Sequence, residues 1–296
     1  MEKWTRSYYL TVQTNAQAQE FIDISMPLTI KFHIKRNVNS STNTATITVL
    51  NLGEDTRRKV FLDNYKTMYY KRVELRAGYS LGKETLPLIF KGNIQNAFSQ
   101  RNGVDYETTI NALDGGFAYV NGHSSKQFAK GTTDKQMLRA LISDLSSKDP
   151  NKGCHIEIGK IGDFKFPLTR GNTLDGQTVA YLNDISEGHF FIDLETAHCL
   201  LDDEGFEGNI KVIDSNCGLL GSPLRQEAFL TFEMIFEPRL QIGQFVEINS
   251  KTEKIYNGTY KVVGIEHTGT ISYAQSGQCK TRVSLQYVTG VPKFVN

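Results

Sequence analysis

Hydrophobic and polar residues alternate with a period of two along much of the chain, most regularly near its C-terminal end. In the stretch FLTFEMIF, residues 229–236, every second residue is a bulky apolar one, which is typical of a strand with one buried face. Pro238 then removes a backbone donor, and Gly243 precedes another short strand at 245–248. With NGTYKVVGIEHTG and CKTRVSLQY further on, the pattern predicts a compact antiparallel unit.

The first 112 residues show the same period. Residues 30–35 alternate apolar and charged, a polar turn follows, and ATITVLNL (45–52) returns, which predicts a β-hairpin. A short helix is expected after Glu54, because acidic residues come before basic ones, the order that the helix dipole favours. Three further strands follow, with Asn102-Gly103 as a hairpin turn.

The two ends of the chain resemble each other. The predicted matches are Val73-Glu74-Leu75 with Val246-Glu247-Ile248, Phe90-Lys91-Gly92 with Tyr256-Asn257-Gly258, Ile94 onward with Tyr260 onward, and 110–113 with 283–287. Such similarity indicates an internal duplication. Because identities are few, two unrelated small barrels remain the alternative.

The middle of the chain has a helical period. Thr133 and Gln136 have capping-box spacing before an apolar stripe, and a second helix is expected over 173–186 with Gly188 as its stop. A hairpin turning near Glu195 follows. The predicted fold is therefore mainly β with an α+β insertion: two small antiparallel β-barrel domains, 1–113 and 226–296, flanking an α+β domain, 114–225.

Composition describes an ordinary globular protein, with 22% charged and 39% hydrophobic residues and a net charge of +1. The three predicted domains carry 15 basic against 10 acidic residues, 11 against 16, and 7 against 6 (divided after residues 112 and 225). The near-neutral total excludes strong nonspecific attraction to nucleic acid as the main activity. The sequence has no run of 18 apolar residues, so no membrane-spanning helix is predicted. Folding in a cytoplasm is expected.

Motifs for catalysis or metal binding are weak. The four cysteines are widely spaced and none forms a C-x-x-C pair, and His189 and His198 form at best a cross-hairpin pair, more commonly structural than metal-binding. Acidic residues between Asp193 and Glu204 leave a carboxylate dyad as an open alternative. We expect no catalytic, cofactor or metal site, and hence no enzyme.

The segment FEPRLQIGQFVEINS followed by NGTYKVVGIEHTG resembles the baseplate hub proteins of contractile-tailed bacteriophages, including the smaller late-control-type hubs. TATITVLNLGEDTRRKVF resembles their first-barrel hairpin and helix, and RGNTLDGQTVAYLNDISEGHFFIDL resembles the inserted domain. The resemblance implies a homotrimer in which two related barrels per subunit surround a channel. Its expected partners are the tail tube protein, the spike protein and the tape-measure protein C-terminus, with DNA passing through the channel unbound. The expected location is the virion tail baseplate, after synthesis in the host cytoplasm.

Interface residues would then matter more than any catalytic group. The candidates lie on stretches expected to be sheet edges or exposed aromatic patches: Thr46, Thr48, Leu50, Tyr69, Tyr70, Arg72, Phe229, Phe232, Phe236, Phe245, Val246 and Ile248. Two alternatives are kept: a ligand- or glycan-binding tail module, and a cell-wall hydrolase.

Overall fold

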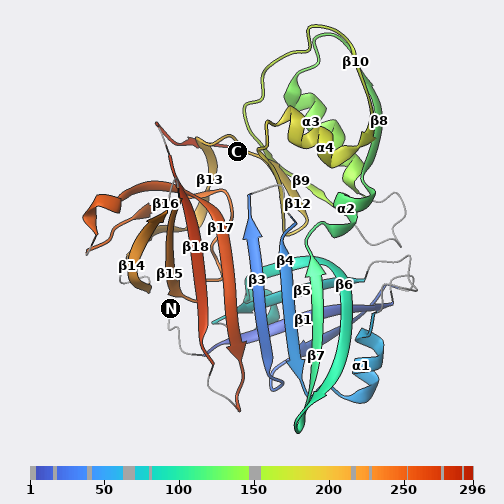
Figure 1. The fold of residues 1–296 in the computed structure, drawn as a ribbon, viewed down its shortest axis with the longest axis vertical. Coiled ribbons are helices and arrows are strands. Elements are labelled where there is room, and N and C mark those ends of the chain that lie inside the picture. Colours follow the sequence, from blue (N-terminus) through green and yellow to red (C-terminus); the bar gives the residue numbers. More distant parts are fainter. Residues whose placement is uncertain are drawn as a thin grey trace.

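The computed structural model describes most of the chain. The described residues are 5–15, 19–38, 42–62, 71–79, 82–146, 155–214, 218–226, 229–251, 253–274, 277–288 and 290–295. No helix among them is long and apolar enough to cross a membrane. The protein is mainly β, as predicted, and most of its strands form a broad sheet. Three helices, residues 116–121, 134–142 and 178–185, gather at one end, and the short helix 54–60 lies toward the other (Figure 1).

Five strands build the first β unit, in the spatial order β3-β4-β7-β6-β5. Their bounds are β3 Ile30–Asn37, β4 Thr44–Leu50, β5 Arg72–Gly78, β6 Leu88–Asn102 and β7 Asp105–Leu113. Beyond β5 the sheet continues into β1 (Ser7–Asn15) and β2 (Glu20–Ser25), while α1 (Glu54–Val60) connects β4 to β5. The predicted turn at Gly103 is confirmed: its φ is +63°, and Asn102 pairs with Asp105.

The second β unit repeats this pairing order as β14-β15-β18-β17-β16. Its strands are β14 Leu219–Gln226, β15 Phe229–Ile235, β16 Gln244–Ile248, β17 Gly258–Ile271 and β18 Cys279–Tyr287. β13 (Glu204–Ile213) runs parallel to β16 and to the short β19 (Lys293–Phe294). β13 and β14 therefore pair with the C-terminal strands, although they lie within the predicted insertion 114–225.

Register irregularities align the two units residue by residue. β6 has an extra residue between Ile94 and Asn96, and β17 has one between Val262 and Gly264. Ile94 therefore corresponds to Val262, two residues away from its predicted match, Tyr260. A slip of two keeps each side chain on the same face, so hydrophobic alternation alone does not detect it.

The two units join through one antiparallel junction, in which β17 pairs with β3 from Gly264↔Asn37 to Ile271↔Ile30. The strands of the two units thus belong to one continuous sheet of 14 strands, and no closed barrel is found among the described strands. The expectation of two separate barrels is not confirmed. The local pattern predicts strands, but it carries no information on a pairing between residues more than 200 positions apart.

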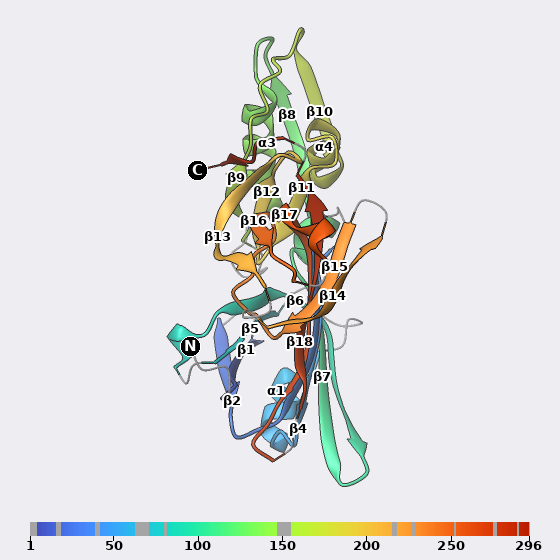
Figure 2. The ribbon, with the colours of Figure 1, turned by 90° about the vertical axis from the view of Figure 1, so that its left-hand side faces the viewer.

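The inserted segment has its own hydrophobic core and lies at one end of the sheet (Figures 1 and 2). Its elements are α2 Gly116–Asn121, β8 His123–Phe128, α3 Asp134–Ile142, β9 Glu157–Ile161, β10 Asn172–Gln177, α4 Thr178–Ile185, β11 Phe190–Asp193 and β12 Thr196–Cys199. The capping box of Thr133 and Gln136 is confirmed. The helix expected from Thr173 is wrong in its first part, because residues 172–177 pair with β8 as a strand.

Short 3-10 turns complete the fold at Lys83–Thr85, Ser143–Leu145 and Lys254–Tyr256. On the long strands one face contributes to the cores and the other is polar. On β3, for example, Ile30, Phe32 and Ile34 are buried, whereas Lys31, His33 and Lys35 are exposed. We call the second face, over β4, β7, β3, β17, β18 and β15, the polar face.

Candidate assembly surfaces

Most of the predicted interface stretches are not sheet edges. β4 lies between β3 and β7, β15 lies between β14 and β18, and β16 lies between β13 and β17. Their backbone hydrogen bonds are therefore used within the chain, and the edge assignment is wrong. Tyr69 and Tyr70 lie outside the described residues.

Several candidate side chains are core residues. Buried among apolar neighbours are Leu50, Phe232, Phe236, Phe245, Val246 and Ile248. They do not lie on an accessible surface of this chain. Alternation turns Phe232 and Phe236 inward, whereas the consecutive residues Phe245 and Val246 are both buried because both sides of β16 are covered. Arg72 forms a contact within the chain, since its Nη2 donates to Glu195 of the inserted segment.

Three of the candidates lie on the polar face. Thr46 Oγ1 donates to Asn111 Oδ1 at 3.0 Å, and Thr48 is hydrogen-bonded to Thr109 at 3.1 Å. Phe229 is exposed at the start of β15. These side chains belong to a surface that runs across both units.

Charges alternate across this surface where the units meet. Glu233, Arg282, Glu266 and Lys35 lie directly opposite one another on β15, β18, β17 and β3. Glu266 is 2.5 Å from His33 Nε2 and 3.9 Å from Lys35 Nζ. We call this row the charge ladder; opposite charges across neighbouring strands stabilise their pairing.

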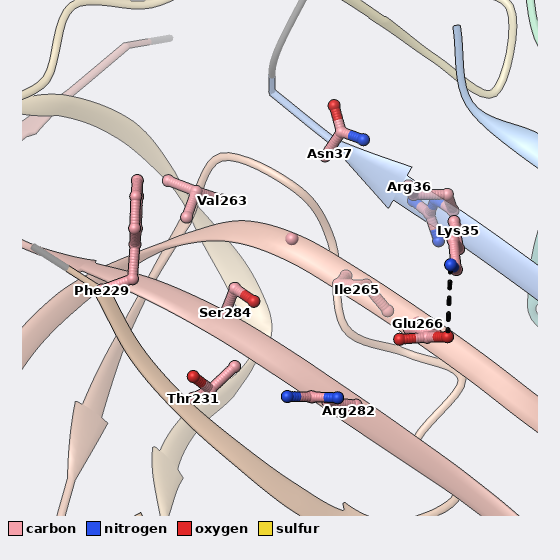
Figure 3. Close-up of a pocket in the computed structure, with 11 residues that line it drawn as sticks. Lys35, Arg36, Asn37, Phe229, Thr231, Val263, Ile265, Glu266, Arg282 and Ser284 are labelled. Atoms are coloured by element: carbon pink, nitrogen blue, oxygen red, sulfur yellow. Dashed lines mark ion pairs between the residues drawn. The ribbon is translucent and has the colours of Figure 1, made fainter. Parts of the chain in front are cut away.

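Three of the ladder residues, Lys35, Glu266 and Arg282, line an open hollow of about 460 Å³ over the junction. Figure 3 shows the side chains of Lys35 and Glu266 facing each other there. Arg282, Thr231 and Ser284 lie beside them on β18 and β15. The hollow combines both charge signs and is open, so it has the character of a wet surface more than of an enclosed ligand site.

A buried ionic cluster fixes the inserted segment to the first unit. Arg36 on β3 is almost fully buried and donates from Nε and Nη2 to the carboxylate of Asp193 at 2.7 and 2.5 Å. Asn43 donates to Ile192 O at 2.9 Å. A bidentate pair of this kind is oriented and strong, and it holds the β11–β12 hairpin against β3.

Asp114, directly after β7, completes this contact. Its carboxylate accepts hydrogen bonds from the backbone N–H groups of Leu194 at 2.6 Å and Glu195 at 2.8 Å, which form the turn of the hairpin. Burial, with the negative charges of Asp193 and Glu195 nearby, raises the pKa of Asp114 to about 7. The turn itself needs left-handed backbone, with φ +54° at Leu194 and +59° at Glu195.

The same turn makes a second ionic contact, since the fully buried Glu195 lies 3.1 Å from both Arg72 Nη2 and Lys91 Nζ. This docking cluster was missed from the sequence. One signal was present: Arg36 occupies the inward position of β3, in step with Ile30 and Ile34, where an apolar residue is expected.

The histidines and acidic residues that were candidates for metal binding or catalysis make structural contacts. His198 stacks on Phe191 and Phe206, and burial lowers its pKa to about 4. His189 bonds instead to Ser186 O. Glu204 accepts from the backbone N–H groups of Asp163 and Leu201. Among the described residues no group of three metal-ligating side chains is found.

Comparison with known proteins agrees with this fold. Residues 9–270 match the model of the family described as baseplate hub gp41. The chain belongs to this baseplate hub family. No curated protein sequence matches it significantly.

Solved structures similar to this hub chain include a 43 kDa tail protein of prophage MuSo2 from Shewanella oneidensis (TM-score 0.60, 9% identity, 95% of this chain and 96% of that one). A tail protein from Neisseria meningitidis is similar to the same degree (0.59, 10%, 95% and 96%). An E. coli component of the type VI secretion system, described as structurally similar to the T4 tail proteins gp27 and gp5, is also similar (TM-score 0.55, 9% identity). The match covers 90% of this chain and 78% of that one. At such identities the likeness concerns the fold. With the family match it supports a structural role in a phage tail baseplate.

Proposed function

We propose that this hub chain forms a homotrimeric ring whose six similar β units, two per copy, join a hexameric tail tube to a trimeric spike. The observation that carries the proposal is the repeated strand order of the two units, aligned by their bulges. Two similar units in each of three copies match a sixfold partner on one side and a threefold partner on the other.

The proposed partners are those that the resemblance to baseplate hubs implies. The tube protein contacts one rim of the ring, the spike and the tape-measure C-terminus occupy the other surfaces, and DNA passes through the channel. Among the similar structures are complexes of Francisella VgrG with PdpA, which support a partnership with a spike. In the proposed ring each of the six β units forms one sixth of the circumference. The chain is located in the virion tail.

The test is the state of the purified protein. Analytical ultracentrifugation at micromolar concentration is expected to show a stable trimer, and negative-stain images are expected to show a ring with a central channel. A species that sediments only as a monomer would overturn the proposal. Glycan affinity that persists in such a monomer would favour the binding-module alternative instead.

A further inference from the structure

A cavity lies where the two β units and the inserted segment meet. Its volume is about 390 Å³, within the range of sites that bind small ligands. The lining comes from β3, from the β5–β6 connection at 84–88, from the β11–β12 turn at Leu194, and from the β15–β16 connection at 238–241. A single chain therefore supplies the whole lining of this cavity, which we call the junction cavity.

Apolar side chains form the walls of the junction cavity. Leu86 and Leu240 are each 1% exposed, so they are fixed by the packing around them. Leu86, Pro87 and Pro238 converge on Gly78, where an added Cβ would lie 3.1–3.5 Å from all three side chains. Because these walls are packed across both units, the cavity is formed before a ligand binds.

Arg36 supplies the buried polar group of the cavity. Alternation places Lys35 and Asn37 on the polar face and turns the Arg36 side chain inward, where the residue is 2% exposed. Asp193 accepts from Nε and from Nη2, which uses two of the five N–H donors of the guanidinium. No acceptor for Nη1 is found among the described residues. The Nη1–Nη2 edge is therefore left for a group that enters the cavity, because a buried N–H without an acceptor costs free energy.

The charges around the cavity favour an anion. Its lining includes Arg36 and Arg239, whereas its acidic residue is Glu84, which is exposed at the rim. Arg76 adds a third guanidinium, since its Nη1 donates to the carbonyl oxygen of a lining residue at 3.2 Å. Asp193 is not part of the lining and lies at the other edge of the Arg36 guanidinium, where it orients that group. A negatively charged group is therefore better matched to the cavity than a cation.

We propose that the junction cavity binds a carboxylate group, held by the Nη1–Nη2 edge of Arg36 and by Arg239, with the apolar body of the ligand against the leucine and proline walls. A planar guanidinium edge fits the two oxygens of a carboxylate in a bidentate arrangement. The inference is independent of the proposed ring, because one chain supplies the whole lining. Two sources offer this chemistry: a small carboxylate with an apolar tail, and the C-terminus of a peptide that ends in an apolar residue.

The first test compares two probes of the same shape, isocaproate and isocaproamide. In a titration of the full chain followed by ligand-observed NMR, the acid is expected to bind at least about tenfold more tightly, because the amide loses charge-assisted hydrogen bonds to the guanidinium groups. Equal affinities for acid and amide, or no binding of either, would overturn the proposal. A monomer in sedimentation, which overturns the ring, leaves this result standing.

A peptide probe identifies the source of the carboxylate. Acetyl-Ala-Leu carries the same isobutyl group and carboxylate as isocaproate on a peptide backbone, and its C-terminal amide is the matched control. If the peptide acid binds at least about tenfold more tightly than isocaproate, the site takes a chain terminus, because the added backbone then makes contacts of its own. If the peptide acid binds no more tightly than isocaproate, the site takes a small carboxylate.

Variants at the rim locate the binding site, because Arg36 itself also holds the inserted segment. Arg239→Gln is expected to weaken isocaproate binding at least about fivefold, and Glu84→Gln is expected to strengthen it by about twofold to fivefold. Arg282→Gln and Glu233→Gln make the same changes of charge on exposed residues of the polar face and should leave the affinity unchanged. Equal effects of the rim variants and the polar-face variants would overturn the assignment to the junction cavity.

Discussion

The two β units share a strand order but hold their polar faces together with different chemistry. In the first unit Thr48 bonds to Thr109 and Thr46 bonds to Asn111, which are neutral contacts. The positions of Thr48 and Thr109 are taken in the second unit by Glu233 and Arg282 of the charge ladder. Most inward positions are apolar in both units, with Arg36 in the first and His267 and Thr281 in the second as exceptions. The buried face therefore determines the fold, and the polar face is free to vary.

The units also differ in how they contact the inserted segment. The first unit anchors the inserted segment with the ionic cluster of Arg36, Asp114 and the residues that pair with Glu195. The second unit contacts it differently, because Lys261 donates to the carbonyl oxygens of Leu200 and Leu201 and the core of this unit includes Phe191. The difference teaches that a duplicated framework keeps its register while its surfaces specialise, one for docking and the other for charge.

The largest expected effect comes from the shared core. Ile47 and Phe232 occupy the same buried position in the two units. Ile47→Ala is expected to lower the free energy of unfolding by about 2–5 kcal/mol and Phe232→Ala by about 3–5 kcal/mol, measured by urea denaturation with circular dichroism. Phe232→Asp is expected to prevent folding, because it buries an unpaired charge.

The outward neighbour provides the control for this position. Glu233→Asp changes an exposed side chain on the same strand and should leave the unfolding midpoint almost unchanged. A soluble, assembled Phe232→Asp protein would contradict the inward assignment of that residue.

The docking cluster should give the next largest effect. Arg36→Met leaves Asp193 buried without its cation. The free energy of unfolding, measured by urea denaturation, is therefore expected to fall by about 3–5 kcal/mol. Arg72→Met should cost less, because Lys91 still lies 3.1 Å from Glu195. Equal losses for the two variants would show that Glu195 depends on Arg72 alone.

Much of the local structure was predictable. The alternation of β3, β4 and β15, the capping box at Thr133 and the turn at Gly103 depend on residues close in sequence, and the structure has them as predicted. The helix predicted from Thr173 failed at its start because pairing with β8 overrides local propensity.

Neighbour relations were not predictable in the same way. Interface candidates such as Thr46 and Phe232 were placed on edges, yet their strands have partners on both sides. Which strands meet is decided by contacts between distant residues, as in β3 with β17, and a period of two is the same on an edge and in the interior. The ionic cluster around Arg36 was hidden for the same reason, since its partners come from three separate segments.

The pH dependence of the docking contact is a smaller effect. The pKa of Asp114 is raised to about 7 in the folded protein, so between about pH 4 and pH 7 the folded state binds the proton and the unfolded state does not. Stability is therefore expected to fall as pH rises through this window, by at most about 1.4 kcal/mol per pH unit. Asp114→Asn should flatten that slope, measured by urea denaturation from pH 4 to pH 8, while losing one of the two backbone hydrogen bonds. An identical slope in the variant would assign the dependence to other groups.

The smallest expected effect distinguishes the two polar faces directly. A double-mutant cycle with Glu233→Gln and Arg282→Gln should give a coupling energy of about 0.2–1 kcal/mol that decreases in high salt, because the two side chains are opposite charges at the surface. The corresponding cycle with Thr48→Val and Thr109→Val should give a coupling that salt leaves unchanged, since that pair is neutral. If both couplings respond to salt alike, the units do not differ in the chemistry of their polar faces. If only the first responds, the charge ladder belongs to the second unit and to its junction with β3.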